Sequence, residues 1–575
     1  MSAGSKTEEF DMSKIEKPAI LACDTLLPSG DYNCYDYYIA NTEKFGCDYV
    51  AFQHMGRDHM RSEFIADIEA LSYYFQNDLG FKKGDVYSVF MPNTAECMTI
   101  FYALNKLGVI VNFIHPLLPP DVLLDTMQFT RSNGVVMLES FIPRYISVIK
   151  EHNVPAVVVC PAMYAMPAQA KGTVKPAEDV AKLLDDNGIS WIGYPEIVTK
   201  YAGKTVDGLH NNPEDIAVYL NGGGTTGKSR TIMHNNKCLN EIITKIGGNI
   251  EPMEKPGSCH KVVSLPFFHA YGLAAGGFST LVNGAVLVPM MRFEADKFVE
   301  LLQKLNCYEI VGVPNMYKKL LAEPGFAGEH LSRIKYMFAG GDYVAEDFSN
   351  EFTAVMEKYG SEAKLLAGYG LTEACAIDCS NTNWEYKMGS VGKPLRGNIA
   401  EIWDENCNKL PNGEIGEIVF TGSTVMVGYL NHEGIENKGV YIDENGTRWI
   451  RTGDCGFMDD EGFVYFRGRE KRLIVISGYN VFPHDIETTV MTLGYFDECC
   501  AVQGYKDGKE IVRLYCVLHD KDADKAQIEK DVIELCEKKL TIFSVPRDIQ
   551  YIDAIPRTRM EKVDFMKLTE TKPLT

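Results

Sequence analysis

The sequence comprises 575 residues, of which 46% are hydrophobic and 23% are charged, and its formal net charge is −21. A chain of this length exceeds what one hydrophobic core supports, so two or more domains are expected. The acidic balance, with a sequence pI near 5.1, argues against general nucleic-acid binding, because neutralising phosphates requires clustered Lys and Arg.

The N-terminal segment, MSAGSKTEEFDMSK, is polar and mostly acidic. It has neither the apolar core of a secretory signal nor the Arg-rich character of a transit peptide. The 16 Cys are scattered without metal-ligand spacing, and without an export signal they are expected to be mostly buried free thiols. We therefore expect a cytoplasmic protein.

The first third of the chain alternates helix and strand patterns. Phe64, Ile68, Leu71 and Phe75 fall at gaps of four, three and four, which predicts one face of a helix. The segment VYSVF predicts a strand, and the next helix is expected to begin at a cap, Asn93 or Thr94, and to end at Gly108. VIVNFI, a helix from Pro120, VVML and AVVVC continue the alternation. Such strand–helix–strand units predict a mostly parallel, doubly wound sheet.

The stretch from Leu265 to Met291 carries no formally charged residue and is long enough to span a bilayer. It also contains four Gly, His269, Asn283 and a Pro near each end. These residues favour a buried helix followed by a buried strand over a transmembrane segment.

After about Gly389 the pattern changes to short strands with Gly-rich turns, which predicts a small antiparallel sheet or barrel. From Arg472 a compact mixed segment follows, with a helix over 483–493, strands over 498–505 and 511–519, and a charged surface helix over 522–540. We place a domain boundary near 468–472.

A glycine-rich loop lies within IAVYLNGGGTTGKSRTIMHNN, residues 216–236. Its consecutive Gly and paired Thr suit an anion, and the segment from Gly222 to Ser229 fits the nucleotide loop of P-loop NTPases. That loop requires a helix to begin at its Lys-Ser/Thr. Here RTIMH alternates and predicts a second strand, so we favour a hairpin tip.

Further segments accompany this loop in a fixed order. They are LPFFHAYG (265–272), AGGDYV (339–344), GYGLTEA (368–374), RTGDCGFMDDEGFVYFRGREKRLIVISGYNVFPHDIE (451–487) and IPRTRMEKVD (555–564). Together they resemble the acyl-adenylate-forming superfamily of acyl-CoA synthetases, peptide-synthetase adenylation domains and firefly luciferase. The resemblance runs from about residue 60 to the C-terminus.

The resemblance implies an α/β fold. A large N-terminal domain of doubly wound sheets (1–470) would include a small β-barrel-like subdomain (about 389–468), followed by a small mobile α+β C-terminal domain (471–575). It implies a reaction with ATP, Mg²⁺ and coenzyme A, in which a carboxylate becomes an acyl-adenylate and then a CoA thioester. The sequence leaves open whether the chain forms a homodimer.

The resemblance also implies roles for individual residues. Lys562 would stabilise the transition state, His269 would be a gate between acyl pocket and thiol channel, and Thr372 would contact the α-phosphate. Tyr369 would stack on adenine, and Asp454 would bind the ribose hydroxyls with Arg469 as a second contact. Glu373 and Thr226 would hold magnesium. The remaining expected nucleotide, hinge and loop residues are Gly223, Gly224, Thr225, Gly227, Lys228, Arg230, Gly341, Asp342, Gly370, Lys471 and Gly478.

Several of these residues also allow simpler interpretations. Thr372 and Glu373 suit a helix start after a strand, Asp454 or Arg469 could form a surface ion pair, and a lone His such as His269 is commonly a satisfied core residue. Lys562 could be an ordinary surface Lys. The agreement of several segments favours the functional roles.

The sequence departs from the family pattern in two places. The phosphate loop has Ser229-Arg230-Thr231 where Pro-Lys-Gly is usual, which leaves open whether Arg230 or Lys228 meets pyrophosphate, and Gly223 replaces a hydroxyl residue. Met560-Glu561 replaces the Ser-Gly before the catalytic lysine, and Phe565 stands where a basic residue is common. These changes bear on loop contacts and efficiency, while the reaction class is unaffected.

The acid substrate is specified only by class. The stretch 265–277 has no acidic residue for an amino group, and no carrier domain follows Lys562, so a CoA ligase is favoured over an enzyme that loads a carrier protein. An inactive binding homologue would tolerate the loss of Glu373, Asp454 and Lys562, all of which are present. The expected acyl-pocket residues are mostly small or apolar, as suits a fatty or aryl acid: Tyr271, Ala275, Val313, Ala339, Gly340, Ala367 and Gly370.

Overall fold

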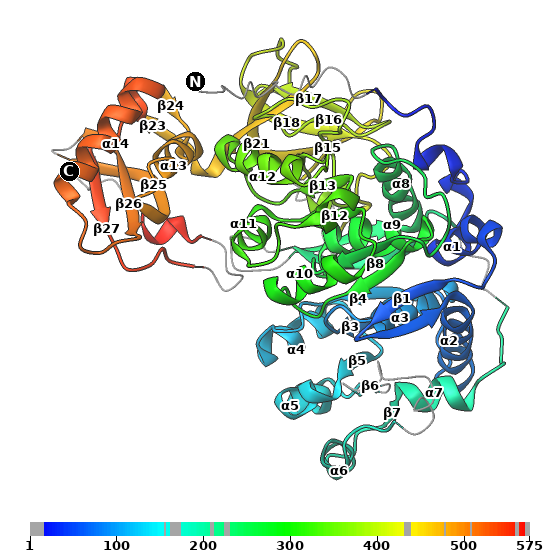
Figure 1. Cartoon of the computed structure of the whole chain (residues 1–575). Helices are drawn as coiled ribbons and strands as arrows, with labels where there is room; N and C mark the ends of the chain where they lie inside the picture. Colours follow the sequence, from blue (N-terminus) through cyan, green and yellow to red (C-terminus); the bar gives the residue numbers. More distant parts are fainter. Residues whose placement is uncertain are drawn as a thin grey trace.

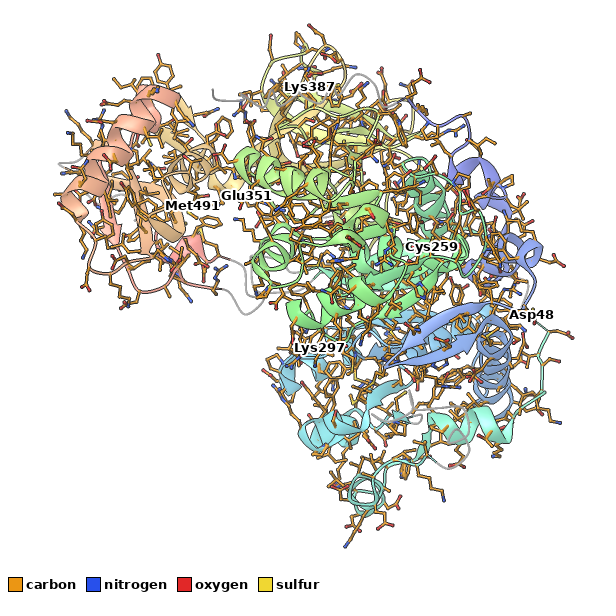
Figure 2. The ribbon with its side chains drawn as sticks, viewed as in Figure 1. Asp48, Cys259, Lys297, Glu351, Lys387 and Met491 are labelled. Atoms are coloured by element: carbon orange, nitrogen blue, oxygen red, sulfur yellow. The ribbon has the colours of Figure 1, made fainter. Side chains whose placement is uncertain are left out.

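The computed structural model describes residues 16–154, 157–161, 174–207, 212–222, 230–430, 439–476, 479–506, 509–557 and 563–569. It contains a large N-terminal domain and a small C-terminal lobe that lies beside α11, α12 and β21 (Figure 1). In this view Met491 and Glu351 lie on either side of the junction between the two lobes (Figure 2).

The largest sheet has eight strands in the order β19-β9-β8-β4-β3-β5-β6-β7. The strands from β8 to β7 are parallel, whereas β9 and β19 pair antiparallel. Their bounds are β3 (Val86–Phe90), β4 (Ile110–Phe113), β5 (Val135–Leu138), β6 (Val157–Cys160), β7 (Trp191–Gly193), β8 (Ile216–Gly222), β9 (Arg230–Asn235) and β19 (Gly428–Tyr429). The accompanying helices are α1 (Cys34–Thr42), α2 (Arg61–Tyr73), α3 (Ala95–Lys106), α4 (Pro120–Phe129), α5 (Ile142–His152), α6 (Glu178–Asp186), α7 (Tyr194–Lys200) and α8 (Asn236–Gly247).

The predicted alternation of helices and parallel strands is confirmed. Phe64, Ile68, Leu71 and Phe75 are all buried, as the helical spacing predicts. Of the two expected caps for α3, Thr94 is the one used, since its side chain accepts a hydrogen bond from the Cys97 amide at 3.3 Å.

Two further sheets complete the α/β part of the N-terminal domain. One has the order β10-β11-β1-β2 and the other β12-β13-β14-β15-β16, in which β12, β13 and β14 are parallel. Their strands are β1 (Val50–His54), β2 (Arg57–Met60), β10 (His260–Val263), β11 (Val286–Pro289), β12 (Glu309–Gly312), β13 (Tyr336–Ala339), β14 (Leu365–Tyr369), β15 (Cys379–Ser380) and β16 (Lys393–Pro394). The helices are α9 (Ser279–Val282), α10 (Ala295–Lys304), α11 (Pro314–Ala322) and α12 (Glu346–Lys358).

Most of the uncharged stretch 265–291 is buried inside this domain, as predicted, although His269 and Met291 are exposed. A π-helical segment, Gly272–Phe278, runs into α9, and β11 follows as a strand buried at every position. In the part of the chain that the structure describes, no helix has the length and apolar character needed to cross a membrane.

The predicted small antiparallel sheet is also present. Its strands are β17 (Ile399–Trp403), β18 (Gly416–Thr421), β20 (Val440–Ile442), β21 (Arg448–Met458) and β22 (Val464–Arg469). β21 pairs with β18, β20 and β22, and every pairing is antiparallel. All sixteen Cys lie in the described residues and are free thiols, most of them buried.

The C-terminal lobe begins after a short 3₁₀ turn, Glu470–Arg472. It consists of β23 (Ile474–Ile476), β24 (Tyr479–Val481), α13 (Pro483–Met491), β25 (Phe496–Lys506), β26 (Lys509–Leu518), α14 (Lys525–Lys539) and β27 (Asp548–Tyr551). Ile486, Leu514 and Val532 belong to a hydrophobic core built only from this lobe. The domain limits at 470 and 471 remain a prediction.

Candidate active site

The expected acyl-pocket residues gather at the carboxyl ends of three parallel strands. Ala339 of β13 pairs in register with Ala367 of β14, and β12 ends directly before Val313. A Cβ at Gly340 would lie 3.4 Å from the Tyr271 ring, and one at Gly341, whose φ is +83°, would lie 3.6 Å from Val313. Glycine at these two positions therefore leaves room beside Tyr271 and Val313.

Two further pocket residues come from the π-helical segment Gly272–Phe278: Ala275 lies within it, and Tyr271 directly precedes it. The Tyr271 hydroxyl donates to the Phe338 carbonyl at 3.3 Å, and burial raises the pKa of the phenol. Ala275 is buried, and its carbonyl accepts a 2.7 Å hydrogen bond from Lys261 Nζ. Lys261 is itself buried against Glu309 at 2.6 Å, so this ion pair lies directly behind Ala275.

The segment after β14 differs from the expected helix start. Thr372–Ala374 forms only a three-residue 3₁₀ turn, and its N-terminal flank is Leu371, so Thr372 is not a helix cap. Gly370 is required here by sterics, because a Cβ would lie 2.0 Å from the Ala376 carbonyl oxygen. The backbone folds back on itself instead of continuing into a helix, which presents Thr372 and Glu373 on a tight turn.

Contacts from distant segments fix this turn, which carries Thr372 and Glu373. His234 Nε2 donates to the Thr372 carbonyl at 2.7 Å, and the Met426 amide donates to the Glu373 carbonyl at 2.8 Å. The Tyr429 hydroxyl donates to Glu373 Oε1 at 2.9 Å. Burial lowers the pKa of His234 to about 4, so its imidazole is neutral at physiological pH.

The glycine loop connects β8 and β9, which pair antiparallel up to Gly222 and Arg230. A strand therefore follows the loop, as predicted, and the P-loop alternative, which requires a helix there, is wrong. Gly223, Gly224, Thr225, Thr226, Gly227 and Lys228 lie outside the described residues. The Arg230 guanidinium lies 5.1 Å from the centroid of the Tyr429 ring.

Tyr369, Asp454 and Arg469 form one connected group. The Tyr369 hydroxyl donates to Asp454 Oδ2 at 2.6 Å, while Arg469 Nε lies 3.3 Å from Asp454 Oδ1 across the β21–β22 pair. Asp454 is 4% exposed and Arg469 is 62% exposed, so this is not a pair of surface charges. Burial raises the pKa of the Asp454 carboxyl, and Arg469 partly offsets the effect.

The remaining expected residues are less constrained. His269 is exposed, which excludes the core interpretation, and its Nδ1 accepts a 3.4 Å hydrogen bond from the Tyr271 amide. Asp342 is exposed and accepts from the Tyr343 amide at 2.8 Å. Lys471 is exposed on the turn between the two lobes. Lys562 and Gly478 lie outside the described residues.

The donor set on the turn fits magnesium. Glu373 is half-buried with one oxygen engaged by Tyr429, and Thr372 adds a hydroxyl beside it. Across the described ranges, no group of three or more His, Cys, Asp or Glu side chains forms a metal cage. Oxygen ligands from one or two carboxylates, completed by substrate phosphates, are the usual environment of Mg²⁺.

Sequence reasoning missed several residues that hold this arrangement. Tyr429 lies 56 residues from Glu373, and nothing local marks it as a contact. At the junction between the lobes, the Tyr343 and His484 rings lie 4.7 Å apart, and Arg467 pairs with Asp485 at 3.2 Å. These contacts depend on tertiary structure and leave no periodic signal in the sequence.

Comparison with known proteins decides the family. The family model described as AMP-binding enzyme matches residues 40–430, and the one described as AMP-binding enzyme C-terminal domain matches residues 485–562. The chain belongs to the AMP-binding enzyme family, in its CoA ligase branch. This membership confirms the resemblance that the sequence segments indicated.

Relatives of this AMP-binding enzyme include a long-chain-fatty-acid–CoA ligase of Escherichia coli O6:H1, 28% identical over 542 residues and 90% of each chain. A ligase of Rhodococcus jostii that joins a bicyclic dioxo-indenyl propanoyl group to CoA is 27% identical, over 85% of this chain and 90% of its own. Among solved structures, an anthranilate CoA ligase in complex with anthranoyl-AMP superposes with a TM-score of 0.79, 20% identity and 94% and 97% coverage. An o-succinylbenzoate CoA synthetase of Bacillus subtilis with ATP and magnesium superposes with a TM-score of 0.71 and 19% identity, over 93% of this chain and 98% of its own.

Proposed function

We propose that this enzyme, an AMP-forming acyl-CoA synthetase, activates a carboxylic acid with an uncharged, largely apolar tail. The carboxylate attacks the α-phosphorus of ATP and pyrophosphate leaves, giving an acyl-adenylate. The thiol of CoA then attacks the acyl carbon and AMP leaves. The observation that carries the proposal is the convergence of the Thr372–Glu373 turn and the small residues at the carboxyl ends of β12, β13 and β14.

The roles proposed for the nucleotide site follow from chemistry and position. Tyr369 contacts adenine, and Asp454, held by Tyr369 and Arg469, accepts hydrogen bonds from the ribose hydroxyls. Thr372 donates to the α-phosphate, which stabilises the charge that develops there. Bound through Glu373 and Thr226, Mg²⁺ supplies charge neutralisation at the phosphates.

Four more residues keep the roles that the resemblance implies. Lys562 delivers an ammonium group to the reacting carboxylate and α-phosphate during adenylation. His269, exposed in the present arrangement, gates the passage between acyl pocket and thiol. Lys471 lies at the hinge about which the small domain turns between the two half-reactions, and Gly478 belongs to the loop that enters the site.

Two observations support an apolar acid. Ala275 and Ala339 are buried, Gly340 leaves space beside Tyr271, and Val313 is aliphatic, so the expected pocket offers no exposed charge to a substrate tail. Of the proteins named above, one is a long-chain-fatty-acid–CoA ligase and another is an anthranilate CoA ligase. Fatty acids and substituted benzoates are the first classes to test.

The test is to identify the nucleotide products. The purified enzyme is incubated with ATP, Mg²⁺ and single acids, both fatty acids of increasing length and benzoates, with and without CoA. AMP, pyrophosphate and an acyl-CoA detected by mass are expected. AMP without acyl-CoA would instead indicate a carrier-protein acceptor, and ADP with phosphate would contradict the proposal.

A further inference from the structure

A short segment, Val425–Tyr429, lies directly beside the Thr372–Glu373 turn, and we call it the strap. The strap contacts Glu373 twice. The Met426 amide donates to the Glu373 carbonyl at 2.8 Å, and the Tyr429 hydroxyl donates to Glu373 Oε1 at 2.9 Å. The main chain and the carboxylate of Glu373 are therefore both oriented by the strap.

The strap is anchored to the eight-stranded sheet. Its last two residues form β19, which pairs with β9 at Met233 and Ile232. The Val427 amide donates to the Met233 carbonyl at 2.9 Å. Because β9 directly follows the glycine loop, the strap joins the phosphate-loop hairpin to the turn that carries Glu373.

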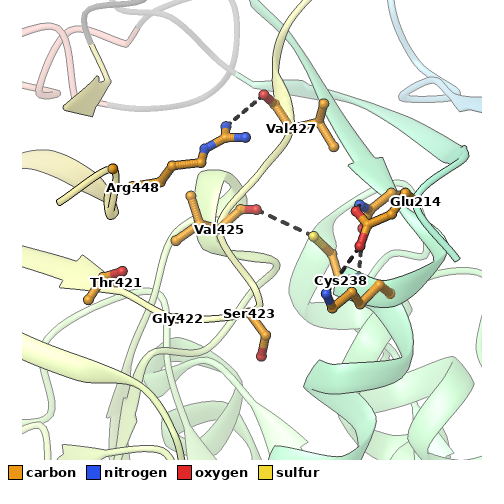
Figure 3. Close-up of a pocket in the computed structure, with 11 residues that line it drawn as sticks. Glu214, Cys238, Thr421, Gly422, Ser423, Val425, Val427 and Arg448 are labelled. Atoms are coloured by element: carbon orange, nitrogen blue, oxygen red, sulfur yellow. Dashed lines mark hydrogen bonds and ion pairs between the residues drawn. The ribbon is translucent and has the colours of Figure 1, made fainter. Parts of the chain in front are cut away.

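The outer side of the strap lines a surface pocket of about 390 Å³ (Figure 3). From that side, Arg448 donates to the carbonyls of Met426 and Val427, each at 2.7 Å, and Cys238 Sγ donates to the Val425 carbonyl at 3.4 Å. These contacts satisfy the carbonyls of the strap and restrict its movement away from Glu373.

Tyr429 has a second contact on the nucleotide side. Its ring lies 5.1 Å from the Arg230 guanidinium, so one side chain touches both the arginine that follows the phosphate loop and the carboxylate proposed to hold magnesium. A carboxylate with a fixed rotamer binds a metal ion more tightly than a mobile one, because less conformational entropy is lost on binding.

We propose that Tyr429 is a positioning residue for magnesium-dependent ATP binding, and that it acts by orienting the Glu373 carboxylate through its hydroxyl. The inference rests on the proposed function, in which Glu373 binds Mg²⁺. The hydroxyl holds Oε1 at 2.9 Å, and a carboxylate held in this way would be preorganised for the ion. The hydroxyl of Tyr429 also takes part in a hydrogen bond with Arg230, whose guanidinium lies against the ring.

The test compares Tyr429→Phe with wild type by calorimetric titration of ATP, in Mg²⁺ and in EDTA, without any acid. The variant keeps the ring beneath Arg230 but loses the contacts of the hydroxyl with both Glu373 and Arg230. An effect that acts through Arg230 needs no metal ion, so it appears in EDTA as well as in Mg²⁺. The gain in affinity from Mg²⁺, which is the ratio of the ATP dissociation constants in EDTA and in Mg²⁺, is expected to fall about fivefold relative to wild type, as for one lost hydrogen bond. In a Glu373→Gln background the same substitution is expected to change this gain no further.

Tyr465→Phe is the matched control, because Tyr465 donates to the Asp459 carboxylate at 3.3 Å in the small antiparallel sheet, outside the site. The inference would be overturned if Mg²⁺ raised the ATP affinity of wild type and Tyr429→Phe by the same factor. It would also be overturned if Tyr429→Phe lost the same ATP affinity with and without Mg²⁺, or if its effect added to that of Glu373→Gln. Wild-type protein that binds no ATP would defeat the proposed function itself. If wild type binds ATP more tightly in Mg²⁺ and Tyr429→Phe gains the same affinity, only the inference about Tyr429 fails.

Discussion

Asp454, the residue proposed to bind ribose, carries a carboxylate that is almost fully buried. Its carboxylate is 4% exposed, and burial raises its pKa despite Arg469 at 3.3 Å. A carboxyl whose pKa is higher in the folded than in the unfolded state is harder to ionise in the folded state. At neutral pH, where it is ionised, this group therefore destabilises the folded protein. Tyr369 stabilises the anion through its 2.6 Å hydrogen bond without removing that cost.

Asp454→Asn is therefore expected to weaken ATP binding and to raise Tm. The amide keeps an acceptor for Tyr369 but loses the charge that would strengthen the proposed hydrogen bonds to ribose, which should reduce ATP affinity by about tenfold or more. The gain in Tm over wild type should shrink as the pH falls through the Asp454 pKa, because protonation relieves the same cost in wild type. Calorimetric scans from pH 7 to pH 4 measure this, and a lower Tm for the variant at pH 7 would contradict it.

At the scale of elements, the pairing of β14, β15 and β16 depends on one glycine. Gly392 has φ +86°, and a Cβ there would lie 1.9 Å from the Ser380 carbonyl carbon. Gly413 has a similar φ of +85° with nothing within 4 Å. Gly413→Ala should lower the free energy of unfolding only by the strain of a left-handed alanine, about 1–2 kcal/mol. Gly392→Ala also forces two backbone segments apart and should lower it by about 3 kcal/mol more.

Urea denaturation of the two glycine variants measures the difference. Gly392→Ala is expected to unfold at a clearly lower urea concentration than Gly413→Ala. It should also weaken ATP binding, because β15 pairs with the end of β14 that carries Tyr369. Coincident unfolding midpoints would show that the backbone at Ser380 can move aside.

Elements with local patterns were predictable, and contacts between distant segments were not. The spacing of Phe64, Ile68, Leu71 and Phe75 predicted α2 and the π-helical turn Tyr74–Asp78 that continues it. The alternation after Ser229 predicted β9. The helix expected at Thr372 is only a 3₁₀ turn because Gly370 packs against the Ala376 backbone, a contact without periodicity. Tyr429 and His234 escaped notice as supports of the turn because each is far from it in sequence.

At the scale of the whole molecule, a small contact holds the C-terminal lobe in its present position. His484 packs against Tyr343 at 4.7 Å and Phe466 at 5.5 Å, and Asp485 pairs with Arg467 at 3.2 Å. Burial, together with the charges of Arg472 and Arg467, lowers the pKa of His484 to about 4. A histidine with a lowered pKa stabilises this contact fully above its ordinary pKa near 6.5, and the stabilisation is lost as the pH falls toward 4.

The double variant His484→Ala/Asp485→Ala is expected to free the lobe. Trypsin should then cut after the exposed Lys471 severalfold faster than in wild type, because the connecting turn becomes more mobile. Asp553→Ala, which removes the exposed ion pair with Lys521 in the same lobe, serves as control and should be cut at the wild-type rate. Equal cleavage of all three proteins would show that other contacts hold the lobe.

The place of β19 in the large sheet has a consequence during synthesis. β9 ends at Asn235, yet the strand that covers its edge is Gly428–Tyr429, so the ribosome must add 429 − 235 = 194 residues before the sheet is complete. At about 5–20 residues per second this takes roughly 10–40 s. Throughout that interval the nascent chain presents an uncovered strand edge, the kind of surface that chaperones shield and that promotes aggregation.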